Sequence, residues 1–205
     1  MEKLEDQAQL RQMITEQKQD TLSLADTINA LLEISKVESG NSATLSTHRI
    51  DELLFDVIAK TSTLDPLFNF QVDFSKRIQK EEDLIIKCNP KLIKIALTNL
   101  LLNCIKYSAD KNATINFTRT GRYIQLNFEN SGPSITEEEN KYLFNYFFRG
   151  QNSLSQRGFG LGLVLIHKIV KLHDGLIEYK TPNPNTNIFQ ISLPLSWFLS
   201  ALRWF

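Results

Sequence analysis

The N-terminal part of the chain carries the pattern of one long amphipathic helix. Over residues 4–38, apolar side chains recur at helical spacing in a stripe about 100° wide, with the members Leu10, Met13, Ile14, Leu24, Ile28, Leu31 and Leu32. Gln17 and Thr21 interrupt the stripe near its middle. Because a helix about 50 Å long cannot bury its stripe on itself, the pattern predicts partner helices in a bundle or coiled coil, with a solvated tether as the alternative.

Beyond a polar stretch at 39–49, which we interpret as a linker, short helical and strand patterns follow one another up to residue 195. Helical patterns cover 50–62, 90–107, 135–148 and the segment that begins at 162. Strand patterns cover 70–75, 83–88, both halves of 113–130 and two runs within 175–195. Because helices mix with mostly antiparallel strands, we predict an α+β domain over 50–195, a two-layer α/β sandwich with helices on one face of a mixed sheet.

Composition and charge exclude several classes of protein. The 205 residues carry 23 basic and 23 acidic side chains, so no net field favours nucleic acid or an anionic membrane. No apolar run reaches the roughly 18 residues that span a bilayer. Cys88 and Cys104 lack metal-ligand spacing, which favours a reducing cytoplasmic setting, alone or within a membrane-anchored parent protein. The aromatic tail at 196–205 either packs on the domain or binds a partner.

The predicted helix at 90–107 contains an unusual polar face. It is apolar nearly all round, which indicates burial, yet Asn99, Asn103 and Lys106 lie within about 60° of one another. Buried amides need hydrogen bonds, so these groups either bond to neighbouring backbone or face a polar ligand. Amide oxygens beside an ammonium suit Mg²⁺ bound to phosphate.

A second candidate lies at 157–170, "RGFGLGLVLIHKIV", where Gly158, Gly160 and Gly162 lead into a helix. Such a segment leaves N–H groups at the positive end of the helix dipole, an arrangement that suits phosphate oxygens. Taken alone the signal is weak, because it matches neither the dinucleotide-binding nor the Walker pattern. Between the two candidates, "ENSGPSI" presents Asn130 and Gly132 at the end of a strand, which by itself is an ordinary turn.

The order of these segments is more specific than any one of them. "NLLLNCIKYS", "NSGPSI", "LFNYFFRG" and "GFGLGLVLIHKIVKLHDG" closely resemble the N, G1, F and G2 boxes of sensor histidine kinases. These kinases belong to the ATPase superfamily that includes gyrase, MutL and ATP-driven heat-shock chaperones. Upstream, "DTINALLEISKVESG" followed by "IDELLFDVI" resembles the second helix of the kinase dimerisation domain and its junction with the catalytic domain. The resemblance implies ATP and Mg²⁺ as ligands.

The resemblance also implies roles for single residues of the N and G1 boxes. Asn103 corresponds to the Mg²⁺ ligand, and Lys106 and Tyr107 correspond to the pair that contacts the nucleotide. Asn130 stands where most members have the aspartate that accepts from the adenine amino group. Its amide oxygen still accepts but carries no charge, so weaker binding is expected.

In the remaining boxes, Phe144, Phe147 and Arg149 match the F box, with Arg149 placed to meet phosphates. The segment 150–158 then corresponds to a mobile lid over ATP. A hinge and a phosphate-facing turn follow, formed by Gly158, Gly160, Leu161 and Gly162. Ser134 replaces the usual second glycine of the G1 box, while Gly132 is retained.

Asn99 separates two activities within the superfamily. Hydrolysing members carry a glutamate four residues before the Mg²⁺-binding asparagine, as general base for water, and this chain has Asn99 there. An amide cannot accept a proton near neutral pH, whereas a histidine acceptor is already nucleophilic. We therefore expect phosphoryl transfer to histidine, with Asn99, Lys106 and Arg149 as the catalytic residues.

None of the three histidines, His48, His167 and His173, has the context of a phosphoacceptor. We therefore expect a catalytic region that transfers the γ-phosphate to a histidine of a parent or partner kinase, supplied in trans. Its other partners would be a response regulator and a second copy, paired through the long helix. The alternatives are a non-catalytic nucleotide-sensing or dimerisation module and, less favoured because of the attached helix, a serine kinase of the anti-sigma type.

Overall fold

The computed structural model describes residues 13, 14, 17, 18, 21, 24, 25, 27–36, 45–75, 77–151 and 158–197. Four predicted features lie partly or wholly outside these residues: Leu10 of the helical stripe, residues 39–44 of the predicted linker, the central lid residues 152–157 and the tail beyond residue 197.

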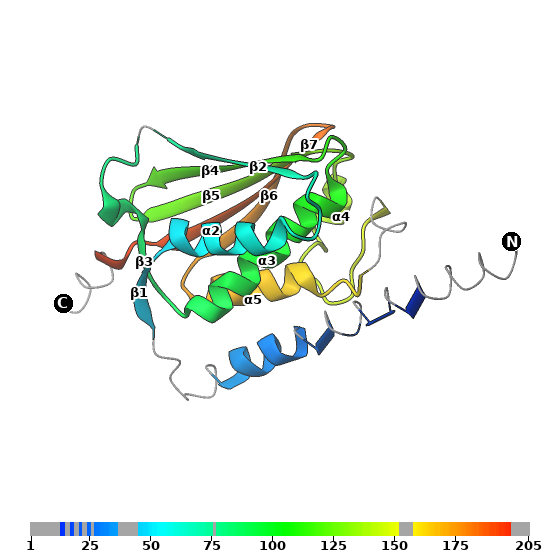
Figure 1. Ribbon diagram of the computed structural model, residues 1–205, viewed down its shortest axis with the longest axis horizontal. Helices are drawn as coiled ribbons and strands as arrows, with labels where there is room; N and C mark the ends of the chain where they lie inside the picture. Colours follow the sequence, from blue (N-terminus) through cyan, green and yellow to red (C-terminus); the bar gives the residue numbers. More distant parts are fainter. Residues whose placement is uncertain are drawn as a thin grey trace, which may run out of the picture.

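A five-stranded sheet covered on one face by helices forms the body of the protein (Figure 1). The strand order is β2-β4-β5-β7-β6, in which β2 is parallel to β4 and every other neighbouring pair is antiparallel. The strands of this sheet are β2 (Asn69–Phe74), β4 (Asn112–Thr120), β5 (Tyr123–Ser131), β6 (Leu176–Asn183) and β7 (Thr186–Pro194). The predicted α+β sandwich is confirmed.

The helical layer and a small second sheet complete the domain. The helices are α2 (Ile50–Thr61), the short 3₁₀ helix η1 (Glu81–Leu84), α3 (Pro90–Tyr107), α4 (Glu137–Asn140) and α5 (Gly162–Leu172). The second sheet pairs β1 (Ser46–Arg49) antiparallel with β3 (Ile85–Cys88). No helix among the described residues is long and apolar enough to cross a membrane.

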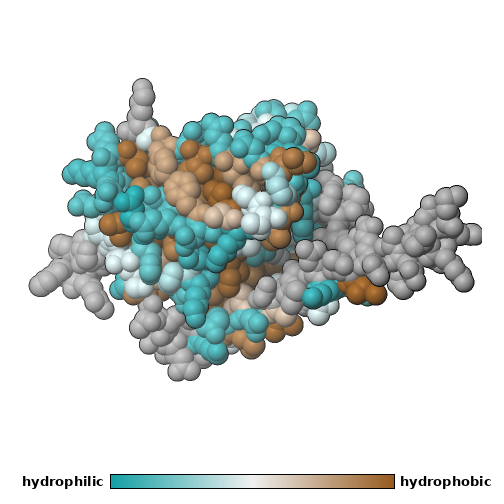
Figure 2. Space-filling model, viewed as in Figure 1, coloured by the Kyte–Doolittle hydropathy of each residue, from teal (hydrophilic) through white to brown (hydrophobic). Residues whose placement is uncertain are grey.

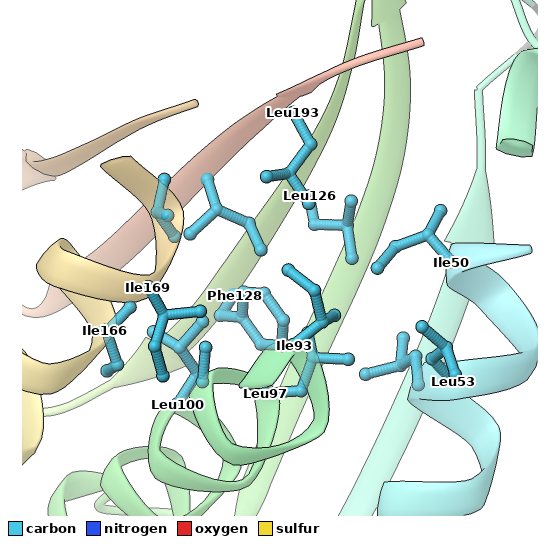
Figure 3. Close-up of a cluster of buried hydrophobic side chains, with 14 of the residues drawn as sticks. Ile50, Leu53, Ile93, Leu97, Leu100, Leu126, Phe128, Ile166, Ile169 and Leu193 are labelled. Atoms are coloured by element: carbon cyan, nitrogen blue, oxygen red, sulfur yellow. The ribbon is translucent and has the colours of Figure 1, made fainter. Parts of the chain in front are cut away.

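The main core lies between the sheet and the helices α3 and α5. Strand β5 alternates strictly, so Ile124, Leu126 and Phe128 are fully buried on the helix side. Figure 3 shows Phe128 facing Leu100 of α3, and Ile166 of α5 close to it. This core fixes the positions of the two helices that carry the candidate site.

Helix α3 starts at residue 90, as its sequence predicts. Asn89 caps it, because its side-chain oxygen accepts from the N–H groups of Lys91 and Leu92, and Pro90 occupies the first turn. The N–H of Asn89 donates to Nε2 of His173, 3.0 Å away at the end of α5. The two helices are thereby tied together at one end.

The N-terminal helix packs on the domain through a face that differs from the predicted stripe. All described residues from 27 to 36 are helical, and Ala30 and Ile34 are buried in the same cluster as the domain core. Of the predicted stripe, Met13, Ile14, Ile28 and Leu32 are 49–57% exposed. These four stripe residues therefore lie on the outer side of the helix, whereas Leu31 of the same stripe packs partly against the core.

The β2 edge of the sheet carries an exposed apolar side chain. Phe74 of β2 is 45% exposed, although its ring stacks on buried Phe117 of β4 with centroids 4.8 Å apart. Phe55 of α2 is similarly exposed, and Figure 2 shows hydrophobic residues gathered on this side of the molecule between polar ones.

The predicted helix at 135–148 is wrong beyond its first turn. Thr136 and Glu139 form a capping box that starts α4, but the helix ends at Asn140. The chain then continues in short turns, with Tyr142 N–H donating to the carbonyl of Glu139. Phe147 has a φ of +61°, which no helix accommodates. Also, residues 46–49 form a strand, and 83–84 belong to η1 instead of β3.

Candidate functional site

The polar face of α3 consists of Asn99, Asn103 and Lys106, and the structure gives these side chains different environments. The Asn99 amide nitrogen donates to the carbonyl of Ile95, 2.9 Å away, so half of this amide is used within the helix. No described residue hydrogen-bonds the half-buried side chain of Asn103. Lys106 is exposed at the C-terminal end. Asn103 therefore fits a hard cation, because its amide oxygen is available.

The turn after β5 lies directly against the end of α3. Asn130 is 5% exposed, and its amide nitrogen donates to the carbonyl of Ser131 (3.0 Å), which also accepts from the N–H of Ala109. Gly132 has a φ of +140°, and a Cβ there would overlap the carbonyl oxygen of Tyr107. Position 132 therefore requires a glycine, because the turn after β5 comes close there to Tyr107, one of the predicted nucleotide-contacting pair.

The segment that resembles the F box is joined to the glycine segment. Phe147 is 72% exposed, and its N–H donates to the carbonyl of Gly160 at 3.1 Å. Gly160 has a φ of +67°, and an added Cβ would lie 2.7 Å from the Phe148 carbonyl oxygen. Phe144 is half-buried and stacks on His167, with ring centroids 5.4 Å apart.

The other residues of the glycine segment and Arg149 have different surroundings. Gly158 has a φ of +153° with no atom within 4 Å of an added Cβ, so only its conformation favours glycine. Leu161 is half-buried at the N-terminus of α5. A Cβ at Gly162 would lie 2.9 Å from the side-chain oxygen of Asn99. Arg149 is half-buried after the turns that follow α4.

Three close approaches by glycines therefore bring the four predicted boxes together. Gly132 meets Tyr107, Gly160 meets Phe147 and Phe148, and Gly162 meets Asn99. As a result, the N-terminus of α5, with its positive dipole end, lies against the polar face of α3.

His167 lies in α5, and His173 follows the C-terminal end of that helix. The pKa of each is lowered, mainly because burial disfavours the charged ring. For His167, the nearby Lys171 and Lys168 lower the pKa further. Glu139 has a lowered pKa because the N–H groups of Gln151 and Thr136 donate to its carboxylate. The bond from Gln151 is 2.7 Å long and anchors the start of the predicted lid.

Two buried residues near the turn after β5 were missed by sequence reasoning. Tyr179 of β6 and Asn187 of β7 are 7% and 5% exposed, and their side chains hydrogen-bond each other and the turn. Asn187 lies directly opposite Asn130 in the register of β5 and β7. Only this pairing across strands identifies them, because neither belongs to a local motif.

Known proteins match the chain in sequence. The family described as histidine kinase-, DNA gyrase B-, and HSP90-like ATPase matches residues 88–196. The sensor histidine kinase HprS of Escherichia coli is 34% identical over 133 residues, which cover 60% of this chain and 29% of that protein. The heme sensor protein HssS of Staphylococcus epidermidis is 30% identical over 169 residues, covering 80% and 35%. The chain thus spans about a third of the length of these two relatives.

Solved structures match the fold. The mycobacterial sensor histidine kinase MprB has a TM-score of 0.65 at 21% identity, covering 73% of this chain and 97% of that chain. The Acinetobacter baumannii histidine kinase AdeS has a TM-score of 0.65 at 22% identity, covering 86% and 80%.

Members of the matched family bind ATP, usually with Mg²⁺. The sequence relatives and the shared fold agree with the order of the four boxes and with their convergence around α3. The chain belongs to the histidine kinase-, DNA gyrase B- and HSP90-like ATPase family, and the relatives that it matches in sequence include sensor histidine kinases.

Proposed function

We propose that residues 50–195 bind Mg²⁺-ATP between α3, the turn after β5 and the glycine segment, and transfer its γ-phosphate to a histidine supplied in trans. The observation that carries this proposal is the set of three glycine approaches, which join the N, G1, F and G2 boxes around the polar face of α3. The unpartnered amide of Asn103 among the described residues adds support, because it offers an oxygen to Mg²⁺.

In this proposal each polar group acts on one part of the nucleotide. Asn103 holds Mg²⁺, which neutralises phosphate charge, while Lys106 and Arg149 bind phosphate oxygens. Asn130 accepts from the adenine amino group through its amide oxygen, since its nitrogen already donates to Ser131.

Asn99 gives the site its preference for transfer over hydrolysis. Its amide nitrogen is committed to Ile95, and its oxygen faces Gly162. An amide does not remove a proton from water near neutral pH. A neutral imidazole needs no such base, so the site favours a histidine acceptor.

The helix at 1–38 supplies the partner surface in this proposal, with 39–49 as linker and 196–205 as tail. Its outward apolar residues Met13, Ile14, Ile28 and Leu32 are half-exposed, and a second copy would bury them in a helical bundle. An acceptor-histidine helix and a response regulator complete the set of partners, in the cytoplasm where ATP is available.

The experiment that tests the proposal is phosphotransfer from [γ-³²P]ATP to the acceptor-histidine domain of the parent kinase. The expected result is acid-labile, base-stable label on the acceptor histidine, lost with Asn103→Ala and retained with Asn116→Ala. Asn116 is a matched control because it is a half-buried asparagine of β4, away from α3. Bound nucleotide without any label on histidine would reject the kinase activity.

A second candidate function is a nucleotide-sensing module without catalysis. Two residues favour it. The uncharged Asn130 stands in place of the aspartate usual in the resembled G1 box, and Ser134 stands in place of its second glycine. The same experiment separates the two, because a sensing module binds ATP without transfer.

A further inference from the structure

The hairpin of β6 and β7 holds the turn after β5 on the side opposite α3. The N–H of Gly132 donates to the carbonyl of Asn185 (3.0 Å), and the N–H of Ser134 donates to the carbonyl of Pro184 (3.2 Å). The hydroxyl of Thr181 donates to that of Ser134 at 2.9 Å. The turn is therefore bound on both sides, by the hairpin here and by the end of α3 at Tyr107 and Ala109.

The centre of this arrangement is the buried hydroxyl of Tyr179. It accepts from the N–H of Ile135 at 2.9 Å and donates to the side-chain oxygen of Asn187 at 2.6 Å. The amide nitrogen of Asn187 donates in turn to the carbonyl of Gly132 at 3.1 Å. One hydroxyl thus connects both ends of the turn, Gly132 and Ile135.

This connection lies beside Asn130, the proposed base-reading residue. Asn187 and Asn130 are opposite each other in the β5–β7 register, and both are 5% exposed. Both groups of the Asn187 amide are used within the protein, so Asn187 supports the turn while Asn130 keeps its oxygen for a ligand.

We propose that Tyr179 is a positioning residue for base recognition: through Ile135 and Asn187 it fixes the turn from Gly132 to Ile135, directly after the end of β5 that carries Asn130, and so sets how selectively the site reads the 6-amino group of the base. This inference rests on the proposed function, because it takes ATP as the ligand. The proposed phosphate-binding side consists of α3 and the glycine segment, whereas the partners of the Tyr179 hydroxyl among the described residues are Ile135 and Asn187. Loss of the hydroxyl therefore affects the base and spares the phosphates.

Tyr179→Phe separates the hydroxyl from the ring. The ring packs on Phe189 with centroids 5.2 Å apart, and phenylalanine retains that packing. The variant leaves the Ile135 N–H and the Asn187 oxygen without their buried partner, which loosens the turn. Tyr123→Phe is the matched control, since the Tyr123 hydroxyl on β5 accepts, among the described residues, from exposed Arg122 alone.

The experiment compares the affinities of the full chain for Mg²⁺-ATP and for purine riboside triphosphate, which lacks only the 6-amino group. We expect the chain and Tyr123→Phe to prefer ATP by about 5-fold, the worth of one hydrogen bond. In Tyr179→Phe the preference falls below about 2-fold, while the affinity for purine riboside triphosphate changes by less than about 2-fold. Hydrogen exchange at the Ile135 amide accelerates in the same variant.

An unchanged preference for ATP in folded Tyr179→Phe would overturn this inference and leave the proposed function standing. If the unmodified chain bound neither nucleotide, the proposed function would fail and the inference with it. Should Tyr179→Phe not fold, Asn187→Ala is measured instead. It keeps the bond between Tyr179 and Ile135 but frees Gly132, and the same loss of preference is expected; a retained preference there rejects the inference.

Discussion

Replacing Gly132 by alanine tests how closely the turn after β5 is held against α3. Gly132 combines a φ of +140° with an added Cβ that would overlap the Tyr107 carbonyl oxygen. Gly121, in the turn between β4 and β5, is the matched control. Its φ is +59°, and no atom lies within 4 Å of an added Cβ. Alanine at Gly121 therefore introduces backbone strain alone.

The two substitutions should differ clearly in cost. Left-handed strain costs an alanine at Gly121 about 1 kcal/mol. At Gly132 the backbone strain is about 2 kcal/mol, and moving the turn away from a main-chain carbonyl adds about 2 kcal/mol. The expected loss of unfolding free energy is thus about 4 kcal/mol at Gly132, about 3 kcal/mol more than at Gly121.

Urea unfolding measures both losses, with an unchanged m-value as the check that only stability has changed. Gly132→Ala should also weaken ATP binding by about tenfold or more, because the displaced turn directly follows the end of β5 that carries Asn130. Gly121→Ala should leave ATP binding unchanged. Equal losses of stability in the two variants, with equal ATP affinities, would refute the close approach as a constraint on the site.

Three further predictions concern stability. Burial lowers the pKa of His173 below its ordinary value of 6.5, so the native state binds fewer protons than the unfolded state. The free energy of unfolding should therefore be fully retained above about pH 6.5 and fall as the pH drops below it. In His173→Gln the free energy of unfolding should fall less steeply with pH. An unchanged pH dependence of this free energy, measured by urea unfolding, would contradict the buried neutral ring. Asp83→Asn should cost about 3 kcal/mol in urea unfolding, because the buried Asp83 carboxylate pairs with Arg119 at 2.7 Å; a loss under about 1 kcal/mol would show a screened pair. Phe128→Ala should cost about 4 kcal/mol by the same assay, since its ring is fully buried between the sheet and α3; a loss typical of a surface position would contradict that packing.

Local signals predicted most of the fold. Helix α3 runs from 90 to 107 as expected, because Asn89 and Pro90 mark its start and its apolar pattern is continuous. The failure at 135–148 has a tertiary cause. The pattern there is helical, but the N–H of Phe147 is bound by the carbonyl of Gly160 in a left-handed conformation. Periodicity does not include a contact between segments that are distant along the chain.

The residues of the candidate site also differ in whether local sequence patterns reveal them. Motif order predicted Asn103, Asn130 and the glycine segment as site residues, because each lies in a contiguous stretch with its own residue pattern. It did not identify Tyr179 or Asn187, whose roles depend on strand register and on a hydrogen bond across the sheet. Such partners are visible only when the strands are paired in space.

The most direct test of the central claim is titration calorimetry with a non-hydrolysable ATP analogue, with and without Mg²⁺. The claim is that the face of α3 binds a metal–nucleotide complex through Asn103. The chain and Asn116→Ala should bind the analogue with Mg²⁺-dependent affinity, and Asn103→Ala should lose at least about tenfold together with the dependence on Mg²⁺. An affinity for the analogue that is the same in Asn103→Ala as in the unmodified chain would contradict the claim.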